Sequence, residues 1–182
     1  MKKILVLLAC MVAMALGASA QENLNFADLP LVNSPAPMPS GYGQLNWTNI
    51  FYVDPSQWSG AGPGYKDRLI EGRLVSQDVA FVGGRVCRLL QEYCFGTVSS
   101  QGGRTSFQAI SAIVAGGFGP TQITVTAYNN GNYVGSSAYL LSTQMAALNF
   151  PSSWGSITQL VFQTSGGGDL VIYDFAAFIL GG

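Results

Sequence analysis

The feature that most constrains this chain is a regular alternation of apolar and polar side chains in its C-terminal part. It runs through residues 106–117, 121–143 and 157–180, with turn sequences between the alternating stretches. Successive side chains of a β-strand point to opposite faces, so this period of two predicts strands with one face in a core. The sequence NNGN at 129–132 lies between two such segments and predicts an antiparallel hairpin, because Asn-Gly fills a type I′ turn.

The turn spacing indicates the fold class. Roughly eight to ten strands, with turns about every 8–12 residues and no long helical pattern, indicate an all-β fold: an antiparallel β-sandwich or jelly roll. The length of 182 residues suits one domain, and only 9% of the residues are charged. A surface rich in hydroxyl and amide side chains is typical of exported β-sandwiches.

The segment PSGYGQLNWTNIFYVDP, residues 39–55, carries the densest group of aromatic side chains. Its apolar residues fall on alternate positions, so we predict a buried strand with Trp47 and Phe51 facing inward. The residues that follow, 54–67, are rich in Gly and Pro and predict a loop. The segment thus predicts a closed core more strongly than a ligand platform.

The first 20 residues combine two lysines, an apolar run and the small residues Ala-Ser-Ala at 18–20. This layout predicts a secretory signal peptide, residues 1–20, cleaved after Ala20. Lipid attachment at Cys10 is the alternative, but the apolar run before it is only six residues long. Residues 21–182 are predicted to form a single β-sandwich domain, secreted to an extracellular or periplasmic location.

The charge of the exported part argues against two classes of partner. Residues 21–182 hold six Lys and Arg against nine Asp and Glu, a net charge of −3. A weakly acidic, charge-poor chain lacks the basic surface that nucleic acids and anionic membranes require. No apolar run after the leader reaches the roughly 18–20 residues of a membrane span.

Two cysteines, Cys87 and Cys94, remain after the leader. An even pair in an exported chain predicts a disulfide, here one that clamps a loop of about eight residues. A metal site is the alternative, but two thiols in a chain without histidine supply too few ligands for zinc. The surrounding residues, 85–100, fit a helical turn or two strand ends, and we predict a hairpin or long loop.

The absence of histidine limits the chemistry available to the chain. It excludes Ser-His-Asp and Cys-His nucleophile systems. Glycoside hydrolysis needs only two carboxylic acids and stays open on composition. None of the available carboxylates lies in a catalytic motif, so we predict that the protein is not an enzyme. These carboxylates are Asp54, Asp67, Glu71, Asp78, Glu92, Asp169 and Asp174.

Calcium is a further use for carboxylates. A sandwich often places its first and last strands side by side, so Asp28 and Asp174 could share a hard cation with backbone carbonyl oxygens. The alternative is that each accepts hydrogen bonds from a nearby turn, as Asp commonly does. We predict no other cofactor.

Aromatic side chains near amides predict sugar binding, because the CH faces of sugars stack on rings while amides pair with hydroxyls. Trp58 and Tyr65 lie in the Gly-rich loop, and Tyr128 and Tyr133 flank the Asn-Gly turn with Asn130 between them. Aromatics are also common in strands and cores, so burial is the alternative for each. We predict that these five residues bind a ligand.

Four sequence pieces occur in a recognisable order: NFADLP at 25–30, GYGQLNWTN at 41–49, GYKDRLIEGRLVSQDVAFVGG at 64–84, and a C-terminal part that includes DFAAF at 174–178. Together they resemble a family of exported single-domain proteins found in fungi and in bacteria, where many carry a C-terminal PEP-type sorting tail. The resemblance implies a jelly roll similar to galactose-binding and other carbohydrate-binding modules.

The resemblance also implies that Asp28 and Asp174 are paired near the chain ends. The usual Asp-Asn of the family is Asp174-Phe175 here, which removes one potential oxygen ligand.

We therefore expect a secreted, non-catalytic carbohydrate-binding or cell-surface-associated β-sandwich that binds a glycan or a cell-wall polysaccharide. A structural or adhesive protein that acts through its strand edges and protein partners is the alternative. A polysaccharide-cleaving enzyme with paired carboxylates comes third.

Overall fold

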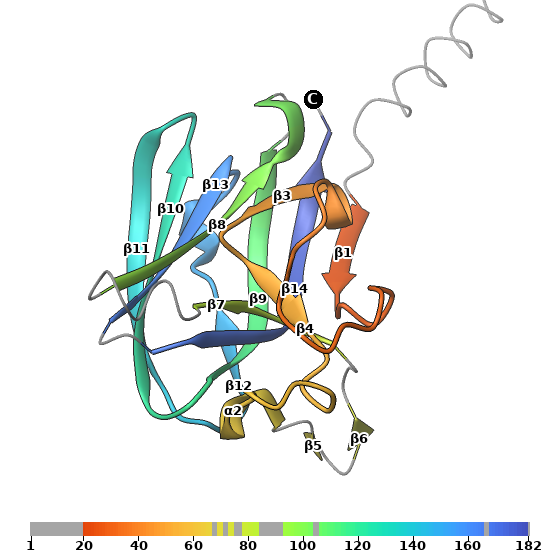
Figure 1. Ribbon diagram of the computed structural model, residues 1–182. Helices are drawn as coiled ribbons and strands as arrows, with labels where there is room; N and C mark the ends of the chain where they lie inside the picture. Colours follow the sequence, from red (N-terminus) through yellow and green to blue (C-terminus); the bar gives the residue numbers. More distant parts are fainter. Residues whose placement is uncertain are drawn as a thin grey trace, which may run out of the picture.

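The computed structural model describes residues 20–66, 69–70, 73–74, 78–83, 93–103, 106–165 and 168–181, which form a sandwich of two antiparallel sheets (Figure 1). Sheet A consists, in spatial order, of β12 (Ala146–Asn149), β9 (Ser106–Gly116), β14 (Leu170–Leu180), β7 (Val79–Val82), β4 (Phe51–Val53) and β2 (Ala36–Pro37), with β1 (Ala20–Leu24) paired to β14. Sheet B consists of β11 (Asn132–Leu141), β10 (Thr121–Asn129), β13 (Gln159–Ser165), β8 (Tyr93–Ser100) and β3 (Leu45–Thr48).

The remaining elements are short. β5 (Leu69–Ile70) and β6 (Arg73–Leu74) form a small separate sheet. The helical segments are α2 (Pro63–Lys66) and the single 3-10 turns η1 (Tyr42–Gln44), η2 (Gln101–Gly103) and η3 (Ser152–Trp154). Within the described residues, no helix is long and apolar enough to cross a membrane.

The connections confirm the predicted fold class. From β7 onward the chain changes sheet at almost every step: β8 lies in sheet B, β9 in sheet A, β10 and β11 in sheet B, β12 in sheet A, β13 in sheet B and β14 in sheet A. Repeated crossing between two facing antiparallel sheets is the pattern of a jelly roll. The protein is an all-β antiparallel sandwich.

The predicted hairpin at the Asn-Gly turn is confirmed. β10 and β11 pair antiparallel from Thr121 opposite Leu141 to Asn129 opposite Asn132. Asn130 and Gly131 have φ angles of 49° and 79°. Both values are positive, as the two central residues of a type I′ turn require.

The aromatic segment 39–55 forms two strands in different sheets, and this corrects one prediction. Asn49, with a φ of 55°, ends β3 in sheet B before β4 begins in sheet A. Trp47 is buried in the main core, as predicted. Phe51 is half-buried and faces away from that core, because the turn shifts the alternation and Tyr52 takes the inward position.

The main core fills the space between the sheets. Sheet A contributes buried side chains such as Ile172 and Phe175, and sheet B contributes Leu160 and Phe162. Burial of one large apolar side chain stabilises a fold by about 1.5–3 kcal/mol. The inward positions of the alternating strands therefore hold the two sheets together.

A second, smaller core covers the opposite face of sheet A. Residues 54–66, which we call the strap, pack Tyr65 and the half-buried Trp58 against this face. The side chains beneath belong to β4, β7, β9 and β14: Val53, Val79, Phe81, Ala115, Val171 and Tyr173. Where these strands lie between the two cores, their successive side chains point alternately into the main core and the second core. Nearly every residue of that part is therefore buried.

Parts of the predicted leader and disulfide lie outside the described residues. These are residues 1–19, and residues 84–92 with Cys87. Ala20 begins β1, which pairs with β14 as the first strand beside the last. Cys94 is buried in β8, and its pairing with Cys87 stays a prediction.

Candidate ligand-binding face

The outer face of sheet B presents rows of side chains that the strand register sets side by side. One row runs Tyr133, Tyr128, Gln159, Ser99 and Asn46, in order from β11 to β3. In β10, β13, β8 and β3 these residues lie at outward positions, opposite the inward positions that fill the core, and Tyr133 is exposed next to the irregularity of β11. The predicted residues Tyr128 and Tyr133 therefore lie at one end of a cross-strand row.

Two further rows continue the face. Ser136, Thr126, Val161, Thr97 and Thr48 form the second row. The third row runs Ala138, Thr124, Gln163 and Phe95. None of the residues in these three rows of the described structure is charged.

Several of these polar side chains have no hydrogen-bond partner among the residues that the structure describes. In the described part of the chain, no hydrogen bond involves the side chains of Thr124, Thr126, Gln159 or Gln163. All four are partly exposed. Their amides and hydroxyls both donate and accept hydrogen bonds, so they can pair with the hydroxyls of a ligand.

The two tyrosines at the hairpin form a pair of rings. The Tyr128 and Tyr133 centroids lie 6.3 Å apart with the planes at 78°. Tyr133 is 63% exposed, and its hydroxyl is 3.2 Å from Oγ of Ser136. Asn130 is exposed at the turn between them, where its backbone N–H donates to Oγ1 of Thr158 over 2.8 Å.

Trp58 and Tyr65 do not join this face. Trp58 stacks on Phe81 with the ring centroids 5.9 Å apart, and Tyr65 is fully buried. Both lie in the second core, on the face of sheet A that is directed away from the main core and from sheet B. Of the five predicted ligand residues, the structure brings together Tyr128, Asn130 and Tyr133, and Tyr65 does not present its ring to solvent.

The residues that sequence reasoning missed are polar and unremarkable singly. Gln159 and Gln163 occupy the outward positions of the segment QLVFQT, and the threonines of β8 and β10 do the same. The alternation alone could have placed them on an outer face. What it could not supply is the strand order, which aligns them with Tyr128 and Tyr133.

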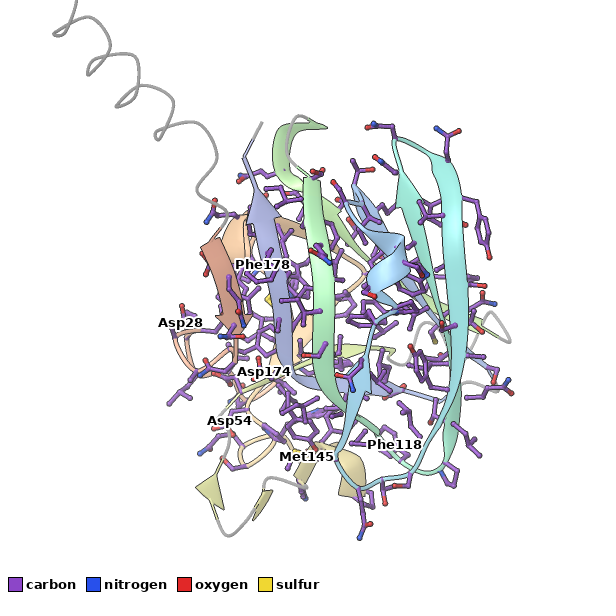
Figure 2. All side chains as sticks on the ribbon, turned by 180° about the vertical axis from the view of Figure 1, so that it is seen from behind. Asp28, Asp54, Phe118, Met145, Asp174 and Phe178 are labelled. Carbon is purple, nitrogen blue, oxygen red and sulfur yellow. The ribbon has the colours of Figure 1, made fainter. Side chains whose placement is uncertain are left out.

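The proposed calcium ligands lie around one tyrosine. The Tyr42 hydroxyl donates a hydrogen bond to Oδ1 of Asp28 over 2.6 Å. Burial, the hydrogen bond and charge of Asp28, and the charge of Asp174 raise the pKa of Tyr42 well above its usual value. Figure 2 labels Asp28 and Asp174 in a view of the molecule from the side opposite to that of Figure 1.

Asp174 is partly enclosed. One of its carboxylate oxygens, Oδ1, is buried without a hydrogen-bond partner in the described part of the chain, and burial raises the pKa of the group. The described residues include no group of three or more His, Cys, Asp or Glu that could hold a metal ion. The calcium site stays a prediction.

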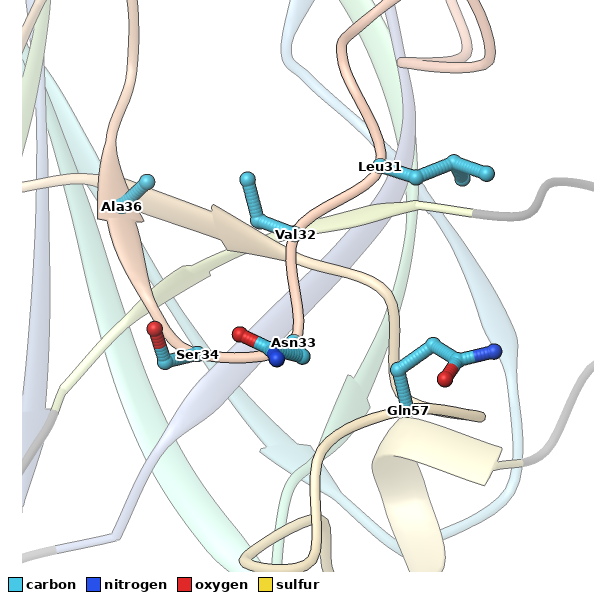
Figure 3. A pocket seen from close by; sticks show the side chains of 6 residues that line it. All are labelled: Leu31, Val32, Asn33, Ser34, Ala36 and Gln57. Atoms are coloured by element: carbon cyan, nitrogen blue, oxygen red, sulfur yellow. The ribbon is translucent and has the colours of Figure 1, made fainter.

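A pocket of about 440 Å³ lies beside β2, where the chain passes from the first strand toward β3 (Figure 3). Its lining is Leu31, Val32, Asn33, Ser34, Ala36 and Gln57. Among the described residues, no aromatic or charged side chain lines the pocket, so they offer neither a ring for stacking nor an ionic anchor. The outer face of sheet B is the better candidate site.

Comparisons with solved structures found similar chains, and one of them supports the sandwich fold. A DUF4465 family protein from Bacteroides caccae is similar with a TM-score of 0.51 and 10% sequence identity, over 89% of this chain and 92% of that chain. TmCBM61 in complex with β-1,4-galactotriose has a TM-score of 0.38 and 11% identity, over 77% and 94% of the two chains. A CBM4 structure has a TM-score of 0.37 and 15% identity, over 86% and 97%.

Of these three similarities, the first alone reaches a TM-score of 0.5. Its sequence identity of 10% is low, so this similarity shows a shared fold and no shared function. No protein-family model matches the chain, and no curated protein matches it. The resemblance to the exported bacterial and fungal family therefore stays a prediction.

Proposed function

We propose that the chain is a secreted, non-catalytic carbohydrate-binding protein and that the outer face of sheet B holds a neutral polysaccharide. The observation that supports the proposal most is the row of Tyr133, Tyr128 and Gln159, set side by side by the register of three strands. A partly exposed ring offers an apolar surface for the CH face of a sugar. The neighbouring glutamine amide then forms hydrogen bonds with the sugar hydroxyls.

The choice of a neutral polysaccharide follows from the charges. Carboxylate and sulfate groups are bound most strongly by Arg or Lys, through charge-assisted hydrogen bonds. The described rows on sheet B contain neither residue. Hydroxyls of neutral sugars need only uncharged donors and acceptors, which Thr124, Thr126, Gln159 and Gln163 supply.

Affinity measurements on a panel of polysaccharides test the proposal. The protein is mixed with neutral β-glucans, galactans, xylans and chitin, and with acidic pectate and alginate as the contrasting group. We expect binding to at least one neutral polymer and none to the acidic ones. If the protein binds none of the neutral polymers, the proposal is overturned.

Three variants locate the site on the face. Tyr133→Ala and Gln159→Ala should each weaken binding by about tenfold, which corresponds to about 1.4 kcal/mol. Leu31→Ala is the control, because Leu31 is also 63% exposed but lies at the pocket beside β2. Equal losses in Tyr133→Ala and Leu31→Ala would contradict a site on sheet B.

Two measurements address the other parts of the proposal. Incubation with the bound polymer should release no new reducing ends, whereas steady release would show an enzyme. Protein recovered from the medium or periplasm should begin at Gln21, as the leader at residues 1–20 predicts. An uncleaved chain that stays in the cytoplasm would contradict secretion.

A further inference from the structure

Strand β11 is an unprotected edge of sheet B. It runs for ten residues, Asn132–Leu141, and pairs with β10 on one side. In the described structure, no backbone hydrogen bond joins β11 to any other strand or loop. Its outer backbone groups are therefore available to a further strand.

The sequence of β11 lacks the features that normally protect such an edge. NYVGSSAYLL contains no proline and no charged residue. Natural sheets use prolines, charges, bulges or short strands at their edges to prevent pairing with other chains. The bulge of β11 lies near Val134 at the turn end, which leaves the stretch from Gly135 to Leu141 in regular register.

The other edge strands in the described part of the chain carry such protection. β3 and β12 have four residues each, and β2 has two residues including Pro37. β1 has five residues and includes Glu22. β11 is the longest of these edges, and unlike β1 and β2 it carries neither a charge nor a proline.

We propose that two copies of this chain pair through β11, antiparallel about a twofold axis, and that the two sheets B form one continuous sheet. A twofold interface uses the same surface on both partners, so each strand matches its copy in length. The edge is neutral, so no like charges oppose each other. Leu140, 79% exposed, and Tyr133, 63% exposed, supply apolar surface beside the junction.

The pairing is expected to be weak and concentration-dependent. Edge-to-edge contact covers little more than one strand on each partner, which places it among the small interfaces. The inference does not rest on carbohydrate binding. Dimerisation would nevertheless extend the uncharged rows of sheet B across both copies.

Sedimentation of the purified protein, from micromolar to submillimolar concentration, tests the proposal. We expect a reversible shift from monomer to dimer. Hydrogen exchange at the same concentrations should show that protection rises with dimer fraction at alternate amides of β11, those directed away from β10. A monomer at every concentration would overturn the proposal, as would a dimer that leaves β11 unprotected.

A pair of lysine variants separates the edge from the rest of the face. Ser136→Lys with Ala138→Lys places charges on β11, whereas Thr126→Lys with Thr124→Lys places them on β10 in the same two rows. Across the twofold axis the first set lies roughly 5 Å apart and the second roughly 14 Å apart, given a strand spacing of about 4.8 Å.

Physiological salt screens charges over about 8 Å, so the β11 variant should be monomeric and the β10 variant should still dimerise. Equal dissociation of both would contradict pairing at the edge. The thermal midpoint shows whether each variant is folded. If the β11 variant is not, the hydrogen exchange of the unmodified protein decides the question.

Discussion

The hydroxyl of Tyr65 donates a hydrogen bond to Oδ2 of Asp169 over 2.7 Å, and both residues are buried. The bond joins the strap to the start of β14. The Tyr173 hydroxyl likewise donates to the carbonyl oxygen of Gly64. These contacts give Tyr65 a structural role in holding the strap on sheet A.

Tyr65→Phe should therefore lower stability and leave polysaccharide binding unchanged. Loss of one partner of a buried hydrogen bond costs about 1–3 kcal/mol, and each 1 kcal/mol lowers the melting temperature by about 2–4 °C at this chain length. Tyr133→Phe, the same change at an exposed hydroxyl, should alter stability by less than about 0.5 kcal/mol. Equal thermal shifts in the two variants would contradict the structural role of Tyr65.

Gly64 lies against the backbone of β9 and tolerates no side chain. Its N–H donates to the carbonyl oxygen of Gly117 over 3.0 Å, and a Cβ at position 64 would overlap the carbonyl oxygen of Gly116. Gly64→Ala should cost about 1–3 kcal/mol, as overpacking usually does. Gly119→Ala is the control, because a Cβ there meets no atom within 4 Å. Chemical denaturation compares the two, and equal midpoints would rule out this tight contact.

Asp174 should make stability depend on pH. Burial raises its pKa in the folded state, so protonation favours folding: this contribution is complete below the unfolded pKa, about 3.9. It is lost as the pH rises through the folded pKa. Asp174→Asn should thus stabilise at neutral pH, by less than about 1 kcal/mol because the group is partly solvated. Near pH 3.5 the gain should vanish.

Thermal unfolding between pH 3.5 and pH 7 measures this difference. The same series tests the predicted calcium site. If Asp174 holds calcium, Asp174→Asn should lower the midpoint at neutral pH, and added calcium should raise the midpoint of the unmodified protein. A gain that is constant over the pH range would contradict the effect of burial.

The predicted disulfide can be tested through its thiols. Protein that is unfolded without reductant should expose no reactive thiol, and reductant should release two, from Cys87 and Cys94. Cys87→Ser should lower stability by at most about 2–4 kcal/mol, because the closed loop is short. It also leaves the buried Cys94 unchanged. Labelling of Cys87 in the unreduced protein would contradict the bridge.

The alternation and the Asn-Gly turn were sufficient to predict the fold class, because both are local signals that the strands keep in the folded protein. The error at Phe51 arose where the alternation was continued through Asn49, whose left-handed backbone transfers the chain to the other sheet. Local sequence gives no sign of that transfer.

The burial of Tyr65 has a different cause. A loop rich in Gly and Pro favours exposure, but Phe81 and Ala115, distant in sequence, provide a second apolar surface that covers the ring. Which residues share the outer face of sheet B depends equally on non-local pairing, such as that of Tyr128 with Gln159. The sequence shows which residue types are present, but only the strand order shows which of these residues are neighbours in space.

Gly131 should fix the register that sets Tyr128 opposite Tyr133. Its φ of 79° is left-handed, and a Cβ there meets no atom within 4 Å. Gly131→Ala therefore imposes a backbone cost alone, about 1–2 kcal/mol. Asn132→Ala is the control in the same hairpin and should cost less than about 0.5 kcal/mol. Denaturation midpoints measure the costs, and if Gly131→Ala were as stable as Asn132→Ala, the turn would not require glycine.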